Sequence, residues 1–130
     1  MNAKALTTAS LALAAAQVYG ACEPNNLTGT WGGSLASSVY GFASACLVTI
    51  APGGSVSSGA CYDSLTFEMR SILSGTASVG ANCIATFTLG FEDTTTVYAI
   101  GMLSKNRDTV VGTYNDTTDD TGSFSIAKPE

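Results

Sequence analysis

The chain has 130 residues, a formal net charge of −5, four cysteines and no histidine. Charged residues make up only 12 %, and no run of basic residues is present, so neither nucleic acid nor an anionic lipid surface is expected as a partner. The absence of histidine removes the usual Ser–His and Cys–His nucleophile systems, so no catalytic residue is predicted. A composition rich in Gly, Ser, Thr and Ala favours short strands and tight turns over long exposed helices.

Residues 1–20 are typical of a secretory signal peptide. One basic residue, Lys4, precedes an apolar run from Ala5 to Ala16, and the small residues Val18 and Gly20 stand at the exit. The run is too short to span a membrane. We therefore expect a single domain over residues 21–130, secreted or periplasmic, without an integral membrane segment. The alternatives are a buried N-terminal helix and a lipid anchor on Cys22.

The cysteine spacing predicts two disulfides. Gly53-Gly54 is suited to a two-residue hairpin loop, which would place Pro52 opposite Ser55 and Cys46 opposite Cys61. The Cys46–Cys61 pair leaves Cys22–Cys83 as the second bridge. No metal site is predicted, because the chain has neither a CxxC motif nor a histidine.

Strand-like segments follow one another after Pro24. The first, residues 27–35, alternates apolar and hydroxyl or glycine positions around Trp31. Residues 97–103 are apolar throughout, so we expect this segment to be covered on both faces or to lie at an interface. The other expected strands are residues 46–51, 56–62, 65–70, 83–91, 110–114 and 124–126.

About eight short strands joined by short connections predict an all-β fold. Neighbouring strands should pair antiparallel in an up-and-down meander, and a meander of this length can close into a barrel and so remove its edges. A closed barrel is our expectation, with a β-sandwich as the alternative.

Three short motifs resemble avidin and streptavidin, which are small secreted barrels of the calycin type. They are Leu27-Thr28-Gly29-Thr30-Trp31, Gly112-Thr113-Tyr114 and the C-terminal stretch from Gly122 to Pro129. The resemblance implies the barrel fold. In the biotin binders an Asn lies two residues after this Trp and a Ser six after it; here these positions are Gly33 and Ser37, so only the Ser matches.

Trp31 shares the expected inward face with Leu27 and Leu35. It either plugs the floor of the barrel or forms one wall of an apolar ligand pocket, since an eight-stranded barrel can be filled by side chains or hold one small ligand. In the second case the predicted ligand-binding residues are Trp31, Ser37, Tyr40, Phe42, Tyr62 and Tyr98.

Carboxylates concentrate in expected turns, where Asp commonly bonds the nearby backbone. A catalytic acid–base use is the alternative for three groups: Asp63 with Glu68, Glu92 with Asp93, and Asp116 with Asp119 and Asp120. A calcium site is the alternative for the segment from Asn115 to Asp120 alone, because its side chains offer oxygen ligands.

The function expected from these patterns is binding rather than catalysis. The leading hypothesis is an exported barrel without a cofactor that binds a small apolar ligand or a protein partner and is able to form oligomers. The alternatives are an inhibitor or surface-interaction protein acting through the loop 104–108 or the loop 115–121, and, more remotely, a carboxylate-based hydrolase.

Overall fold

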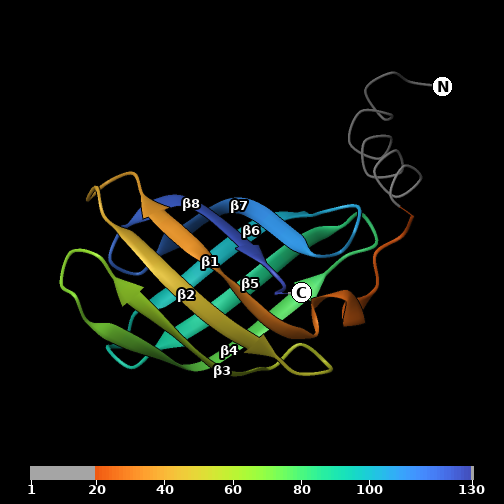
Figure 1. The fold of residues 1–130 in the computed structure, drawn as a ribbon, viewed down its shortest axis with the longest axis horizontal. Helices are drawn as coiled ribbons and strands as arrows, with labels where there is room; N and C mark the ends of the chain where they lie inside the picture. The colour runs from red at the N-terminus through yellow and green to blue at the C-terminus, as the bar shows by residue number, and fades with distance from the viewer. Residues whose placement is uncertain (1–19, 130) are drawn as a thin grey trace.

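The protein is a closed barrel of eight antiparallel strands in up-and-down order (Figure 1). The computed structural model describes residues 20–129. Every strand pairs with its neighbours in sequence, and β1 pairs with β8 to close the sheet. The predicted all-β, up-and-down closed barrel is confirmed, and the sandwich alternative is wrong. The predicted signal peptide lies almost entirely outside the described residues.

One short 3-10 helix precedes the strands. The elements are η1 (Pro24–Leu27), β1 (Gly29–Ser37), β2 (Ala43–Ile50), β3 (Val56–Asp63), β4 (Met69–Val79), β5 (Ile84–Phe91), β6 (Thr96–Leu103), β7 (Thr109–Asp116) and β8 (Thr121–Ala127).

The core lies inside the barrel because apolar side chains alternate along each strand. In β5, Ala85, Phe87 and Phe91 are buried and Leu89 is partly buried against the core, while Ile84, Thr86 and Thr88 are exposed, as the sequence pattern predicts. The Phe87 ring meets Phe124 of β8 edge-on, with ring centroids 6.0 Å apart. Side chains of opposite walls therefore meet in the middle of the barrel.

Strand β4 differs from the prediction. Leu65 and Phe67 belong to a loop rather than to a strand, and β4 begins only at Met69. The Asp63 carboxylate accepts the backbone N–H of Leu65 at 2.7 Å and so turns the chain immediately after β3. The register between β4 and β5 shifts near Leu73, and this bulge interrupts the alternation that would have revealed the strand.

The β2–β3 hairpin reaches the predicted register by a different route. Cys46 does face Cys61, but Ala51 faces Ser55 across a three-residue loop, because the N–H of Ala51 bonds to the carbonyl of Ser55. The predicted two-residue loop is therefore wrong by one residue. A register shift beside Ile50, which pairs with Val56, restores the alignment further along the strands.

Both disulfides have the pairing that the sequence favours. Cys46 and Cys61 lie directly opposite each other inside the barrel wall, with Cα atoms 4.1 Å apart. Cys22 is bonded to Cys83, with Cα atoms 5.1 Å apart, and this bridge ties the segment before η1 to the start of β5. The described residues contain no free cysteine.

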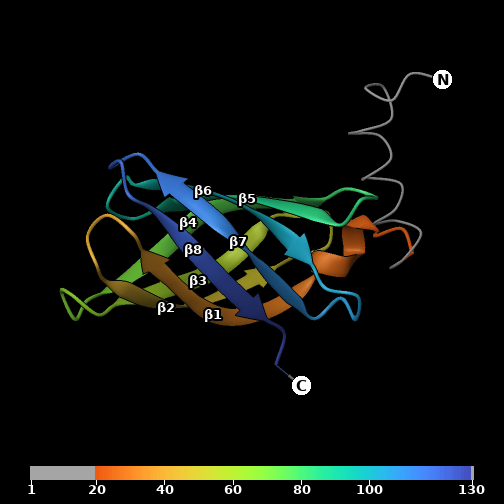
Figure 2. The same ribbon diagram turned by 90° about the horizontal axis from the view of Figure 1, so that it is seen from above.

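The two ends of the barrel differ (Figure 2). We call the end that carries the η1 helix and the Cys22–Cys83 bridge the closed end. The opposite end, which we call the open end, is formed by four loops: residues 38–42, 64–68, 92–95 and 117–120.

Candidate functional site

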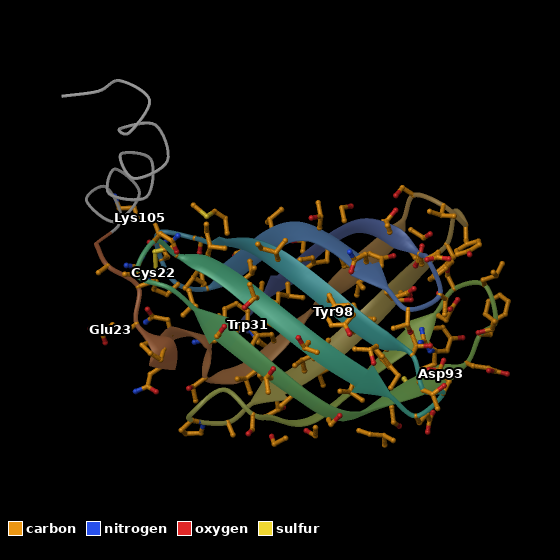
Figure 3. All side chains as sticks on the ribbon, turned by 180° about the vertical axis from the view of Figure 1, so that it is seen from behind. Cys22, Glu23, Trp31, Asp93, Tyr98 and Lys105 are labelled. Carbon is orange, nitrogen blue, oxygen red and sulfur yellow. A yellow bond between two sulfur atoms is a disulfide. The ribbon has the colours of Figure 1, made fainter. Side chains whose placement is uncertain are left out.

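Trp31 forms the floor of the barrel at the closed end. Its side chain is completely buried, and its indole N–H donates to the carbonyl oxygen of Leu27 at 2.8 Å. The Lys128 ammonium lies 5.0 Å from the centre of the ring and bonds to the Asn26 carbonyl. Figure 3 places Trp31 well away from Asp93, which lies at the other end. These contacts give Trp31 a structural role.

The open end contains a pocket of about 330 Å³ that all four loops line. The lining includes two aromatic rings, six carboxylates and a single guanidinium, together with threonine and methionine side chains. The lining residues are Tyr40, Phe42, Asp63, Thr66, Glu68, Met69, Arg70, Glu92, Asp93, Thr95, Asp116, Thr118 and Asp120.

A buried hydrogen-bond chain holds the β1–β2 side of this pocket. Asp120 accepts from the Ser37 hydroxyl at 2.5 Å and from the Tyr114 hydroxyl at 2.9 Å. The same Ser37 oxygen accepts the backbone N–H of Tyr40, so it fixes the loop that carries the aromatic rings. Burial, followed by the bond to Asp120, raises the pKa of Tyr114 far above its usual value of 10.0.

Arg70 closes the apolar interior from the open end. Its guanidinium lies 4.5 Å from the centre of the Phe91 ring and pairs with Asp93 at 2.9 Å. Burial acts to raise the pKa of Asp93, but hydrogen bonds from Arg70 and from the backbone N–H of Thr95 outweigh it and hold that pKa below 3.8. The pocket therefore sits above a charged layer rather than opening into the core.

The loop 64–68 displays apolar side chains to solvent on a rigid support. Leu65 is 64 % exposed and Phe67 is 74 % exposed. Phe67 has a φ of 58°, a left-handed conformation that is uncommon for a bulky residue. Its N–H bonds to the Asp63 carbonyl, and the buried Asp63 carboxylate caps the same loop. The fold thus holds an exposed phenyl ring in a strained position, a combination that is frequent at functional sites.

The space inside the barrel is small. One cavity of about 50 Å³ lies between apolar side chains from several strands, including Leu35, Phe87 and Phe124. Pockets for drug-sized ligands measure about 300–1,000 Å³. This cavity is therefore too small, as it stands, for such a ligand.

The structure brings together only half of the predicted ligand-binding residues. Ser37, Tyr40 and Phe42 meet at the open end, where the Tyr40 and Phe42 rings stack with centroids 6.5 Å apart. Trp31 lies at the closed end, while Tyr62 and Tyr98 are exposed on the outside of the barrel wall.

Sequence reasoning did not single out Arg70 as a site residue. A signal was available, because Arg70 is the only basic residue between Lys4 and Lys105. A lone basic residue in a segment whose other charges are acidic indicates a carboxylate partner, which the structure identifies as Asp93.

Strand β6 is not covered on both faces. Val97 and Leu103 are buried in the core, but Tyr98, Ile100 and Met102 point outward and are 50 %, 51 % and 42 % exposed. A shallow groove of about 700 Å³ runs from Tyr98 and Ile100 across β7 to β8 and β1. No other part of residues 20–129 covers this outer face, so the interface alternative remains a prediction.

Three carboxylates at the open end, those of Asp63, Asp93 and Asp116, bond to the backbone of their own turns. Asp116 accepts from the backbone N–H groups of Thr118 and Asp120, and Asp93 accepts from that of Thr95. These are the turn contacts that Asp usually makes. Within residues 20–129, no three acidic or cysteine side chains are grouped so that they could hold a metal ion. The catalytic and calcium-binding alternatives gain no support from this geometry.

Comparison with known proteins identifies the fold alone. No known protein family and no curated protein matches the sequence. A de novo designed fluorescence-activating β-barrel matches with a TM-score of 0.68 and 15 % identity over 82 % of this chain and 96 % of the design. EF1p2_mFAP2b, in a structure with DFHBI bound, matches with a TM-score of 0.67 and 10 % identity over 81 % of this chain and 95 % of its own. A redesigned β-barrel matches with a TM-score of 0.63 and 11 % identity over 82 % and 94 %.

These matches support the barrel that the resemblance to avidin and streptavidin implied. The finer relation to those two proteins stays a prediction. In the described part of the chain, no helix has the length and hydropathy needed to cross a bilayer.

Proposed function

We propose that this protein is an exported recognition module that binds a protein partner at its open end. The partner places a basic side chain in the acidic pocket and packs apolar surface against the surrounding loops. The observation that carries the proposal is the combination at one end of the barrel: exposed apolar side chains on two braced loops beside a pocket lined by carboxylates.

The exposed apolar side chains supply the contact area. Val39 and Tyr40 on the loop 38–42 are each 54 % exposed, and Leu65 and Phe67 on the loop 64–68 are more so. Aromatic side chains in braced positions lose little conformational entropy on binding, and they are frequent hot spots of protein interfaces. We define these four residues as the apolar rim.

The pocket beside the apolar rim favours a partner with a positively charged side chain. Its carboxylates outnumber its single cation, Arg70, and that cation is already paired with Asp93. A lysine or arginine of the partner would therefore meet uncompensated negative charge. Complementary charge of this kind steers the encounter and rejects acidic partners.

A small ligand fits the site less well than a protein does. The internal cavity of about 50 Å³ is too small for the apolar ligand that the sequence left open. A small molecule in the pocket would leave Leu65 and Phe67 in water. The designed fluorescence-activating barrel and EF1p2_mFAP2b share the fold at low identity, so the DFHBI bound to the second supports only the general idea of a binding barrel.

The disulfides are compatible with export. Bonds such as Cys46–Cys61 persist in extracellular or periplasmic compartments. Because Cys22 is bonded to Cys83, its sulfur is not available for acylation, which favours soluble export over a lipid anchor. The signal peptide over residues 1–20 remains part of this proposal.

Selection of random peptides displayed on phage, against the immobilised protein, tests the proposal. We expect the selected peptides to carry Lys or Arg next to apolar residues. The Phe67→Asn variant removes the ring and introduces a residue that tolerates the left-handed φ at this position. It should weaken binding of these peptides by roughly 30-fold, the scale of a hot-spot residue.

The matched control is Leu47→Asn, which removes an exposed apolar side chain from the outer wall of β2. This variant should bind the selected peptides as the unmodified protein does. Peptides without basic residues, or peptides that bind the Phe67→Asn variant at full strength, would overturn the proposal.

A further inference from the structure

We propose that the outward face of β5, β6 and β7 binds a second copy of this chain, with the two barrels antiparallel. The face is defined by five side chains that point away from the core. They are Ile84, Tyr98, Ile100, Met102 and Val111, which we call the β6 face.

The five side chains form one continuous patch. Met102 pairs with Ile84 on one side and with Val111 on the other, so these three stand in a row across the sheet. Ile100 and Tyr98 follow at successive outward positions of β6. Single exposed apolar residues are ordinary, but a contiguous patch on a folded domain marks an interaction surface.

The charge distribution indicates which partner fits. Among the described residues, no outward-facing side chain in any of the eight strands is charged, and the charged residues lie at the two ends of the barrel or beyond the last strand. An uncharged face offers nothing to attract a partner of opposite charge. It also lets a second copy approach without repulsion, although the chain carries a net charge of −5.

The two ends carry opposite balances of charge, which selects the orientation. The open end has one cation, Arg70, and seven acidic residues: Asp63, Glu68, Glu92, Asp93, Asp116, Asp119 and Asp120. The closed end has three cations, Lys105, Arg107 and Lys128, and two acidic residues, Glu23 and Asp108. Figure 3 shows Tyr98 between Asp93 at one end and Glu23 and Lys105 at the other.

Antiparallel packing places the open end of each copy alongside the closed end of the other. Parallel packing would place the two acidic open ends side by side, and like charges at an interface are costly. With a two-fold axis at Ile100, that residue meets its own copy, and Tyr98 meets Met102 of the second copy in a favourable sulfur–aromatic contact. Thr86 of β5 and Thr113 of β7 flank Ile100 across the sheet, so hydroxyl groups border the apolar contact on both sides.

Sedimentation velocity from the low-micromolar to the millimolar range tests the association. The protein, with both disulfides formed, should change from monomer to dimer over this range. Ile100→Glu would place two carboxylates at the centre of the interface and should weaken association by at least about 100-fold. The milder Ile100→Thr variant, which introduces a residue type already frequent on this wall, should weaken it in the same direction.

The control Leu47→Glu places the same charge on the opposite wall, at a side chain that is 54 % exposed. It should leave the dimer intact. A protein that stays monomeric throughout the range would overturn the proposal, and so would equal loss of the dimer in the Leu47→Glu variant.

Salt and one charge reversal test the orientation. If acidic and basic ends are adjacent, added salt weakens the dimer, and Lys105→Glu weakens it by about 3-fold to 10-fold at low salt. Association that strengthens with salt, or that is indifferent to Lys105→Glu, would contradict the antiparallel arrangement. Neither outcome tests the proposed recognition of a partner at the open end, because the apolar rim is not part of the β6 face.

Discussion

Individual glycines decide how closely the strands of this barrel approach. A Cβ atom built on Gly33 would overlap the carbonyl oxygen of Ser125 on β8, whereas one on Gly32 would make only an ordinary contact with Leu47 at 3.5 Å. Both glycines belong to β1, but Gly33 is at an inward position and Gly32 at an outward position of the sheet, so they form a matched pair. The inward glycine permits the tight curvature at the β1–β8 seam.

Alanine substitutions at these two positions should have opposite effects on stability. Gly33→Ala forces backbone apart and should lower the free energy of unfolding by about 1–3 kcal/mol or more. Gly32→Ala should be neutral or raise it by up to about 1 kcal/mol, because Ala restricts the unfolded chain. Urea unfolding of the two variants checks this, and equal effects would contradict the close packing at the seam.

The raised pKa of Tyr114 should make the stability of the protein depend on pH in the alkaline range. Because its pKa is raised by burial and by the bond to Asp120, the folded state keeps the phenol proton after the unfolded state has lost it. The unfolded state then binds fewer protons, so stability falls as the pH rises above about 10.

A Tyr114→Phe variant should be less stable near neutral pH, since Asp120 loses a donor. Its stability should fall less steeply above pH 10 than that of the unmodified protein. Urea midpoints measured at several pH values between 8 and 11 give the two slopes. The same slope in both proteins would contradict the raised pKa of Tyr114.

The alternation of apolar and polar residues predicts the strands that are regular and misses those that a bulge interrupts. Buried and exposed positions of β5 follow the sequence pattern, as does the inward placement of Cys46 and Cys61. Strand β4 escapes prediction because its bulge near Leu73 breaks the period of two. The hairpin register was right although its loop was wrong, since a bulge beside Ile50 offsets the extra loop residue.

The candidate site was harder to predict than the fold. Tyr62 follows the inward Cys61 directly, so its outward direction could have been inferred from the disulfide. Tyr98 could not be placed in this way, because residues 97–103 are apolar on both faces. The meeting of four loops at the open end depends on barrel closure, which no local pattern contains.

The hydrogen bonds that hold the loop 64–68 should contribute to peptide binding. Asp63→Ala removes the side-chain acceptor for the N–H groups of Leu65 and Thr66 and should free the loop. Peptides selected on the unmodified protein should bind about 10-fold more weakly, because the loop must be ordered on binding. Isothermal titration calorimetry should show a larger entropic cost. Unchanged affinity in a folded variant would mean that the loop does not contribute.

The whole molecule separates its functions by position. The core and the disulfides hold the barrel, the uncharged wall carries the apolar β6 face, and the charges gather at the ends. In an antiparallel dimer, the two open ends would point in opposite directions and both would stay accessible. The proposed module would then present two recognition ends, which raises avidity when both engage the partner.

The most direct test of the central claim, recognition at the open end, is chemical-shift mapping of the ¹⁵N-labelled protein titrated with a selected Lys- or Arg-containing peptide. The largest amide shifts should fall in the loops 38–42 and 64–68 and beside Asp93 and Asp116. Shifts confined to the β6 face or to the closed end around Trp31 would contradict it.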